Sequence, residues 1–197
     1  MYSFSKRAFD LALSLLLLAI LSPLMLLLAL AVRLDSPGPA LFRQRRVGRN
    51  GGEFLILKFR TMRTDAPPDT PTHLMTRASS CITSLGAFLR RTSLDELPQL
   101  FNILKGEMSF VGPRPALWNQ FDLIEARERL GANRVPPGLT GLAQVEGRDE
   151  LPIERKAELD GEYARTACMS LDMRILLRTV RAVAREEGFR EGSGEGR

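Results

Sequence analysis

An apolar segment near the amino terminus, residues 11–32, constrains the fold of this 197-residue chain more than any other feature. As a straight helix it would be about 33 Å long at ~1.5 Å per residue, enough to cross a hydrocarbon core of about 30 Å. Ser22 and Pro23 lie near its middle. Because proline removes the amide that would bond to the carbonyl of Ala19, we expect a kink there, with Ser22 helping to satisfy the freed backbone groups.

The charges that flank this segment indicate that its two ends share one side of a membrane. Lys6 and Arg7 precede it, and arginines follow it at positions 33, 43, 45, 46 and 49. Short flanks rich in Lys or Arg tend to stay cytoplasmic. A re-entrant helix fits both flanks, whereas the residues alone also leave a kinked spanning helix or an uncleaved signal anchor open. A cleaved signal peptide is disfavoured because its apolar region is usually only about 7–15 residues long.

Composition narrows the classes of partner and of chemistry. The net charge of +5 and the pI near 9.8 fit an anionic partner such as lipid headgroups, phosphates or nucleic acid, and charge alone does not choose among them. Cys81 and Cys168 are the only cysteines, which argues against a disulfide framework and favours a reducing, cytosolic-face location. His73 is the only histidine, which argues against Ser-His-Asp machinery and multi-histidine metal sites.

A helix-breaking run, DSPGP at residues 35–39, ends the apolar segment and begins a soluble region. Strands are expected over residues 41–47 and 54–59, because the Asn50-Gly51 pair between them suits a tight hairpin turn. Residues 65–76 are rich in Pro and Thr without an apolar period, which predicts a flexible loop that can serve as a lid.

Helical periodicity follows this loop. Residues 85–89 form a short apolar face, and a second helix is expected through residues 97–104 with a stop at Lys105-Gly106. A last helix over residues 172–185 has apolar residues on one side and arginines on another, so it suits either an anionic lipid surface or solvent.

The adjacent acids Asp95 and Glu96 carry the strongest chemical signal. Ser93 and Glu96 have the spacing of a capping box, while Pro98 suits a helix that starts slightly later. Either way both carboxylates are expected at a helix N-terminus, where partial positive charge favours ionised acids and attracts phosphate. A carboxylate beside Arg90 and Arg91 can bind Mg²⁺ together with substrate phosphates, or attack phosphorus as in aspartyl-phosphate enzymes. Plain capping with surface charge is the alternative for the motif taken alone.

Cations form a second signal. Arg114 stands between Pro113 and Pro115, so its backbone has little freedom, and a rigidly placed guanidinium fits phosphate. Lys58 and Arg60 alternate with apolar residues and should share one face of the second strand. The alternatives are a structural turn for the first and a solvated strand face for the others. The Pro/Gly-rich stretch at residues 135–141 is by itself only a loop.

In order along the chain, these segments resemble the bacterial sugar transferase family, the monotopic polyprenyl-phosphate phosphoglycosyl transferases. The resemblance covers nearly the whole chain. Each motif is weak alone, but the ordered series is specific: KFRTM at 58–62, TSLDELPQL at 92–100, GEMSFVGPRP at 106–115, PGLTGLAQV at 137–145, and LD at 159–160 with Tyr163.

The resemblance implies transfer of a sugar-1-phosphate from a UDP-sugar to undecaprenyl (polyprenyl) phosphate, with Mg²⁺ and release of UMP, as the membrane-committing step of glycoconjugate or exopolysaccharide synthesis. Asp95 matches the family's nucleophile, which forms a phosphosugar-aspartyl intermediate, and is also expected to hold the metal. Glu96 matches its supporting carboxylate. The residues expected to bind the substrates or their phosphates are Lys58, Arg60, Arg90, Arg114, Gln144, Arg148 and Asp160.

The expected architecture is an α+β fold with a re-entrant membrane helix over residues 1–35, broken at Ser22-Pro23. A small helix-rich cytosolic catalytic domain over residues 36–185 follows, with a β-hairpin and amphipathic interfacial helices, and then a disordered tail over 186–197. The resemblance implies the minimal, catalytic-domain-only form of the family, on the cytoplasmic face of the inner membrane. The expected partners are the UDP-sugar, polyprenyl phosphate and membrane lipids, with a homodimer left open and no nucleic acid.

Some positions depart from the family pattern. Many members carry an aromatic residue where Leu142 and Ile153 stand, and often a basic residue at Pro136. These differences concern contacts to the sugar or the nucleotide, and nothing in the sequence specifies the sugar. Two other classes remain open, a nucleotide-sugar phosphohydrolase and a non-catalytic membrane-anchored protein that binds an anionic ligand.

Overall fold

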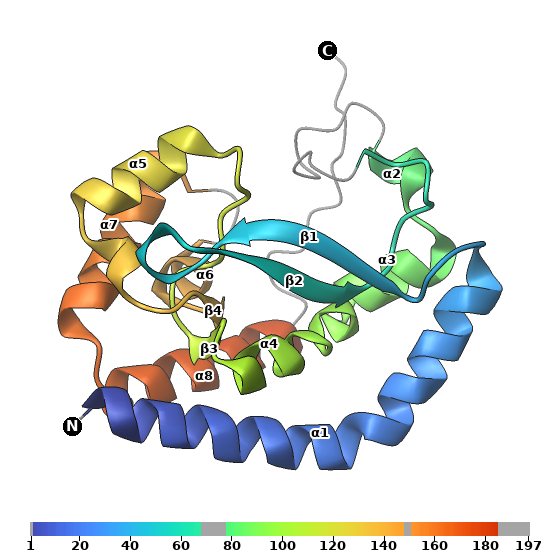
Figure 1. Ribbon diagram of the computed structural model, residues 1–197, viewed down its shortest axis with the longest axis horizontal. Coiled ribbons are helices and arrows are strands. Elements are labelled where there is room, and N and C mark those ends of the chain that lie inside the picture. Colours follow the sequence, from blue (N-terminus) through green and yellow to red (C-terminus); the bar gives the residue numbers. More distant parts are fainter. Residues whose placement is uncertain (1, 68–77, 148–150, 185–197) are drawn as a thin grey trace.

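The computed structural model describes residues 2–67, 78–147 and 151–184, which form an α+β fold. Figure 1 shows a long helix along the bottom and one side, a β-hairpin across the middle, and shorter helices around it. The helices are α1 (Tyr2–Asp35), α2 (Ala78–Cys81), α3 (Ser84–Arg91), α4 (Gln99–Lys105), α5 (Phe121–Arg129), α6 (Leu142–Glu146), α7 (Ile153–Thr166) and α8 (Met169–Ala184). The strands are β1 (Leu41–Val47), β2 (Glu53–Phe59), β3 (Ser109–Val111) and β4 (Gly138–Thr140).

Helix α1 is long and apolar enough to cross a membrane by length and composition, with a mean hydropathy of 2.9 in its most apolar part. It is one continuous helix that changes direction along its length (Figure 1). The hydroxyl of Ser22 donates to the carbonyl of Ala19 at 3.2 Å. That carbonyl is the acceptor that loses its amide partner because residue 23 is proline. Passage of α1 into and out of a membrane on one side stays a prediction.

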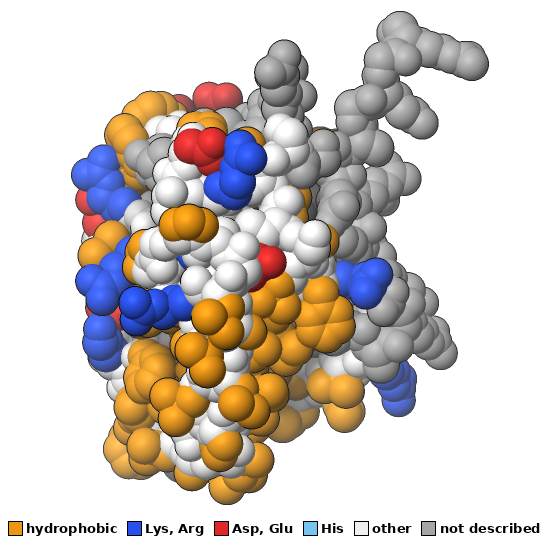
Figure 2. All heavy atoms as spheres, turned by 90° about the vertical axis from the view of Figure 1, so that its right-hand side faces the viewer, with side chains coloured by type: hydrophobic (Ala, Val, Ile, Leu, Met, Phe, Trp, Pro, Cys, Tyr) orange, Lys and Arg blue, Asp and Glu red, His pale blue; other side chains and the backbone are white. Residues whose placement is uncertain are grey.

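The outer surface of α1 is an apolar band. Only 17% of its most apolar part is buried against the rest of the chain. Figure 2 shows apolar side chains gathered over the lower part of one face of the molecule, with Lys and Arg along one edge of that face. Exposed apolar surface of this extent is typical of a membrane or partner contact. The exposed large side chains on α1 are Phe4, Leu15, Leu16, Ile20, Leu24, Leu26, Leu27, Leu30 and Leu34.

Both ends of α1 are bound to the folded domain by polar contacts. Near its start, Lys6 forms a buried ion pair with Asp172 at 2.8 Å. Arg7 donates to the carbonyls of Ile103 and Leu104, the last turn of α4. At the other end, the guanidinium of Arg60 donates to the carbonyls of Val32, Ser36 and Pro37. These contacts place the two ends of the apolar helix on the same folded domain.

The predicted β-hairpin is confirmed. Strands β1 and β2 pair antiparallel, with Leu41 opposite Phe59 and Val47 opposite Glu53. Their connection is a 3₁₀ turn over Arg49–Gly51, longer than a two-residue turn. Asn50 and Gly51 both have positive φ, 55° and 76°, which these two residue types adopt more readily than others. The Asn-Gly pair therefore sets the turn, as the sequence indicates.

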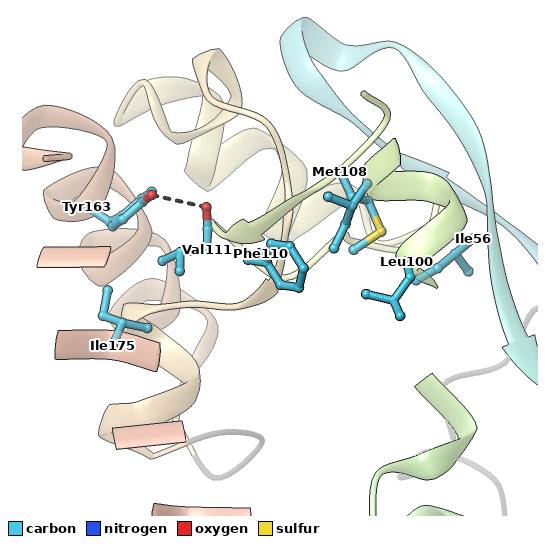
Figure 3. Close-up of a cluster of buried hydrophobic side chains, with 8 residues drawn as sticks. Ile56, Leu100, Met108, Phe110, Val111, Tyr163 and Ile175 are labelled. Atoms are coloured by element: carbon cyan, nitrogen blue, oxygen red, sulfur yellow. Dashed lines mark hydrogen bonds between the residues drawn. The ribbon is translucent and has the colours of Figure 1, made fainter. Parts of the chain in front are cut away.

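The core lies between the hairpin, the short sheet and the helices α4, α7 and α8 (Figure 3). Tyr163 is 1% exposed. Its hydroxyl donates to Asp172 at 2.7 Å and lies 3.1 Å from the carbonyl oxygen of Val111, so this large side chain joins α7, α8 and β3 with its polar atom satisfied. The other buried members of the cluster are Ile56, Leu100, Ile103, Met108, Phe110 and Ile175.

The Pro/Gly-rich stretch that we expected to be a loop contains a strand. β4 pairs parallel with β3, with Ser109 opposite Gly138 and Val111 opposite Thr140. The backbones approach so closely that a Cβ at Gly138 would lie 2.1 Å from the amide nitrogen of Gly112. Glycine is thus required there by packing rather than by a turn. The predicted helices over residues 85–89, 97–104 and 172–185 are present as α3, α4 and α8.

Candidate active site

The adjacent acids lie in a tight 3₁₀ turn, Leu94–Glu96, between α3 and α4. Asp95 is only 8% exposed. Of the two helix starts that the sequence allows, the structure has the later one: α4 begins at Gln99 with Pro98 as its N-cap, and the capping box does not form. Ser93 has a left-handed backbone (φ 58°) and its side chain makes no capping hydrogen bond. It directly follows Thr92, the C-cap of α3, so Ser93 belongs to the end of that helix rather than to the start of the next.

Glu96 is held by two cations on the same oxygen. Its Oε1 accepts from Nζ of Lys58 at 2.7 Å and from Nη2 of Arg114 at 3.0 Å. Burial raises the pKa of Glu96, but Lys58 and Arg114 outweigh that effect and hold the pKa well below its usual range. Glu96 is therefore ionised and fixed in position, joining β2 to the loop after β3.

Asp95 has the opposite electrostatic character. Burial raises its pKa above the ordinary value, and the neighbouring charge of Glu96 raises it further, while Lys58, Arg90 and Arg114 oppose the shift. Two adjacent carboxylates whose pKa values are pushed apart are typical of sites in which the two acids have different tasks. Asp95 is the more basic of the two, as a nucleophile requires.

Arg114 sits on a rigid loop, as its flanking prolines indicate. The loop is tied to β4: the amide of Gly112 donates to Thr140, and the amide of Gly138 donates to the carbonyl of Pro113, both at 2.8 Å. A Cβ at Gly112 would lie 2.3 Å from the carbonyl oxygen of Pro136. The close approach of these two segments fixes the backbone from which Arg114 reaches Glu96.

Asp160 supports this loop from behind. It forms a buried ion pair with Arg127 at 2.6 Å, and Arg127 in turn donates to the backbone carbonyl of Arg114 at 2.8 Å. The two side chains are 1% and 6% exposed. The structure therefore connects Asp160 to the site through Arg127 and the backbone of Arg114.

The remaining predicted site residues have different surroundings. The Nε of Arg90 donates to Thr61 at 2.8 Å, and the side-chain amide of Gln144 donates to the carbonyl of Leu139 at 3.1 Å. Arg60 shares a cleft wall with Lys58, but its Nη atoms are engaged by the carbonyls at the end of α1. This gives Arg60 a structural contact. Arg148 lies outside the described residues, as do most of the expected lid and the tail after residue 184.

Sequence reasoning missed two cations. Arg127 carried no motif signal, because its partner Asp160 lies 33 residues away. Arg46 was counted only as a flanking charge, yet its side chain donates to Oε1 of Gln44 and to the carbonyl of Pro115. Burial and the nearby charge of Arg114 lower the pKa of Arg46 to about 10, against a smaller opposing effect of Glu96. Sequence could have shown that the two arginines differ, because successive side chains of a strand point to opposite faces. Arg46 faces the cleft, so its neighbour Arg45 faces away from it.

One cleft of about 1710 Å³ collects most of these side chains. Its lining includes Arg46, Lys58, Arg60, Arg90, Asp95, Glu96, Arg114, Arg127 and Gln144, but not Asp160. Most of its charged lining residues are cations, and Asp95 and Glu96 are the two carboxylates among the described ones. A cleft lined by cations and a carboxylate with a raised pKa suits a phosphate ester as ligand. The other lining residues are mostly apolar, with Gln, Ser and Thr among them, and come from several elements, including α1, the β1–β2 hairpin and α8.

The donor set also bears on the expected Mg²⁺. Within residues 2–67, 78–147 and 151–184 no cluster of three or more His, Cys, Asp or Glu side chains occurs that would enclose a metal. Mg²⁺ is usually held by one or two carboxylates together with substrate phosphates and water. Asp95, which lines the cleft beside the cations, fits that kind of site and would be the protein ligand.

Comparisons with known proteins agree with this chemistry. The family model described as "bacterial sugar transferase" matches residues 1–186. A UDP-glucose:undecaprenyl-phosphate glucose-1-phosphate transferase of Caulobacter vibrioides is 46% identical over 185 residues, which is 89% of this chain and 68% of the relative. An undecaprenyl-phosphate glucose phosphotransferase of Komagataeibacter xylinus is 45% identical over 186 residues, 89% of this chain.

The chain spans only part of some relatives, 35% of the length of the Komagataeibacter protein. By contrast, it spans 90% of EpsL of Bacillus subtilis, an uncharacterized sugar transferase that is 39% identical over 186 residues. In the long and the short relative alike, the similarity covers most of this chain, which is the part that forms the cleft.

Proposed function

This chain belongs to the bacterial sugar transferase family, and we propose that it transfers a sugar-1-phosphate from a UDP-sugar to undecaprenyl phosphate and releases UMP. The activities for which the Caulobacter and Komagataeibacter relatives are named support the reaction class. The observation that carries the proposal is the placement of Asp95, with its raised pKa, in one cationic cleft beside Glu96 and its two cations. Such transfer commits a sugar to the membrane for polysaccharide or glycoconjugate synthesis.

The reaction proceeds in two displacements at one phosphorus atom. A carboxylate oxygen of Asp95 attacks the β-phosphorus of the UDP-sugar, and the bond from that phosphorus to the bridging oxygen breaks, so that UMP leaves with the electron pair. An oxygen of the acceptor phosphate then attacks the same phosphorus and displaces Asp95 as a free carboxylate. No net proton transfer to the carboxylate is required, which suits a group kept out of water.

The cations serve the charge that develops on the phosphate oxygens. Lys58 and Arg114 face the cleft from opposite elements, β2 and the loop after β3, and Glu96 holds both at 2.7–3.0 Å. Glu96 thereby fixes their direction before substrate binds, so that little reorganisation is needed in the transition state. Asp95, together with the substrate phosphates, would hold Mg²⁺, and the ion would further stabilise the negative charge on the phosphate oxygens.

The contacts of α1 support a re-entrant topology. Lys6 and Arg7 at its start and the carbonyls of Ser36 and Pro37 after its end all bind the same domain. A helix that crossed the bilayer once would separate these two groups of contacts by the hydrocarbon core. The domain therefore lies on the cytoplasmic face of the inner membrane, pressed against the leaflet in which its lipid acceptor resides.

The deciding experiment measures UMP release from a panel of UDP-sugars with and without undecaprenyl phosphate. Acceptor-dependent release supports the transferase, acceptor-independent release supports a phosphohydrolase, and no release across the panel supports a non-catalytic binding protein. Without acceptor, the intact protein should gain the mass of one phosphosugar, located by peptide mapping at Asp95.

Asp95→Asn is the matched variant for this experiment. It keeps the shape of the side chain and loses the anionic nucleophile, so both the adduct and turnover should vanish. Because burial raises the pKa of Asp95, the ionised side chain makes the folded state less stable relative to the unfolded chain, so the thermal midpoint of the variant at neutral pH should be no lower than that of wild type. Full activity in Asp95→Asn would leave direct transfer between the two bound substrates as the mechanism.

A further inference from the structure

The cleft that holds Asp95 is also lined by apolar side chains from several elements, and we call this set the apolar arm. Its members are Leu17 and Leu21 of α1, Leu139 of β4, and Leu176 and Val180 of α8. The apolar arm and the phosphate-binding cations thus line one continuous cleft. A ligand that fills the whole cleft must be anionic at one end and apolar along the rest.

Each of the two helices α1 and α8 contributes residues to the apolar arm from one of its faces only. On α1, Leu17 and Leu21 are four residues apart and share a face, whereas Leu16 and Ile20 are 55% and 62% exposed and are not among the cleft residues. The helix therefore has an apolar face toward the cleft and another toward the surroundings. This continuity gives an apolar chain a path from the cleft to the band of exposed apolar side chains on α1.

Helix α8 shows the same division at neighbouring positions. Leu176 and Val180 line the cleft, while Leu177 is 60% exposed and does not. Val180 is itself 67% exposed although it lines the cleft. An exposed valine in the mouth of a cleft is apolar surface that no described part of the chain covers, and it lies where a bound apolar chain would leave.

We propose that the apolar arm binds the polyisoprenoid chain of the acceptor while the acceptor phosphate lies at Asp95. The inference rests on the proposed function and adds the position of the lipid chain to it. Charge complementarity sets the direction of binding: the cations at Lys58 and Arg114 receive the phosphate, and the chain follows the apolar arm between α1 and α8 toward the membrane. The nucleotide sugar has no apolar chain and makes no use of these walls.

The test compares two pairs of adjacent positions, each with one cleft residue and one exposed neighbour. Val180→Asn is paired with Leu177→Asn, and Leu21→Asn with Ile20→Asn. Each protein is assayed with undecaprenyl phosphate, with geranyl phosphate, which keeps the phosphate and only two isoprene units, and with the UDP-sugar alone for formation of the adduct.

We expect the cleft variants to raise KM for undecaprenyl phosphate by about tenfold, the effect of withdrawing roughly two methylene groups from an apolar site. Adduct formation from the donor and KM for geranyl phosphate should change less than twofold in the same variants. Leu177→Asn should match wild type, and Ile20→Asn, which lies in the exposed apolar band, should change KM for the long and the short acceptor by the same factor. Thermal midpoints within a few degrees of wild type would show that the variants fold.

Three results would overturn the proposal: equal effects within each pair, equal effects of the cleft variants on the long and short acceptors, or a parallel loss of adduct formation. The first would indicate membrane docking in place of a chain-binding cleft, and the last would indicate general damage to the site. Failure of the proposed function is distinguishable, because wild-type protein would then form no adduct and release no UMP with any acceptor.

Discussion

At the scale of single residues, the site rests on the different environments of two adjacent carboxylates. Glu96 forms ion pairs with Lys58 at 2.7 Å and with Arg114 at 3.0 Å, whereas Asp95 is buried and its pKa is raised. The resemblance of the ordered motifs to the family predicted that Asp95, Glu96, Lys58 and Arg114 belong to one site, whereas the local sequence alone marked the two acids and left other roles open for the two cations. It did not predict that Glu96 holds the cations, since that depends on contacts between segments 18 and 38 residues apart.

The pH dependence of adduct formation tests this division of roles. The rate should fall as pH drops through the pKa of Asp95, which is raised from its ordinary value of 3.8. Lys58 lowers that pKa, so Lys58→Met should move the acid limb to higher pH. Glu96 raises it, so Glu96→Gln should move the residual activity's limb to lower pH. Single-turnover rates of adduct formation between pH 4 and 8 measure both shifts, and a change of one pKa unit corresponds to about 1.4 kcal/mol. If the acid limb moved in neither variant, a group other than Asp95 would control the rate.

Arg46 is the second residue-scale prediction. Its acceptors among the described residues are the uncharged Gln44 side chain and a backbone carbonyl, so its charge is available to a substrate phosphate in the cleft. Arg46→Gln should lower kcat/KM about tenfold or more, since hydrogen bonds to charged groups contribute roughly 1.5–3 kcal/mol.

The adjacent Arg45 provides the matched control for Arg46. It lies on the opposite face of β1, pairs with Glu53 at 3.4 Å and stacks 4.2 Å from the ring centroid of Trp118. Arg45→Gln should therefore leave kcat/KM within twofold of wild type. Equal losses in the two variants would assign the effect to the hairpin fold and not to phosphate binding.

At the scale of elements, the chain shows which features local patterns encode. The hairpin, α3, α4 and α8 follow from strand alternation, helical periodicity and Asn or Gly at their ends. The parallel β3–β4 pair does not, because its strands are three residues each and pair across about 30 residues of chain. The buried pair between α5 and α7 is invisible in sequence for the same reason.

That pair gives the first element-scale prediction. Asp160→Asn leaves Arg127 buried without its counter-charge, so it should lower the free energy of unfolding by about 3–5 kcal/mol and loosen the backbone of Arg114. Glu158→Gln on the same helix breaks an exposed pair with Arg155 and should cost less than about 1 kcal/mol. Denaturant titration of both variants compares the two values. A small effect at Asp160 would mean that Arg127 finds another partner.

The second element-scale prediction concerns the bend of α1. Pro23 removes the amide partner of the Ala19 carbonyl, and the Ser22 hydroxyl takes its place at 3.2 Å. Replacing both residues, Ser22→Ala with Pro23→Leu, restores the backbone hydrogen bond and should straighten the helix. A straight helix cannot keep both of its ends on the domain, so activity should fall and the amino terminus should move across the membrane. Unchanged activity and topology would show that the domain contacts alone set the bend.

At the scale of the whole molecule, the proposed topology is supported by contacts that α1 makes outside its apolar part. Lys6 and Arg7 before it and the residue 36–37 carbonyls after it bind elements of one domain, α8, α4 and the end of β2. Some of the flanking cations that the sequence rules assign to the cytoplasmic side thus also bind α1 to the domain. The same contacts therefore position α1 relative to the active site and, in the proposed topology, position the domain relative to the membrane.

Labelling from the two sides of the inner membrane tests that property directly. Ser3 and Asp35 are exposed and lie at opposite ends of α1, so Ser3→Cys and Asp35→Cys can each be made in a chain whose Cys81 and Cys168 are replaced by serine. Because both ends bind the same domain, a membrane-impermeant maleimide should label both new cysteines only in inside-out vesicles and neither in intact spheroplasts. Labelling of Ser3→Cys from the periplasm alone would make α1 a spanning helix. In a spanning helix Lys6 would lie away from Asp172, so their ion pair could not form in the membrane-bound enzyme. Lys6→Met tests this point, because it should lower activity only if the ion pair exists in the working enzyme.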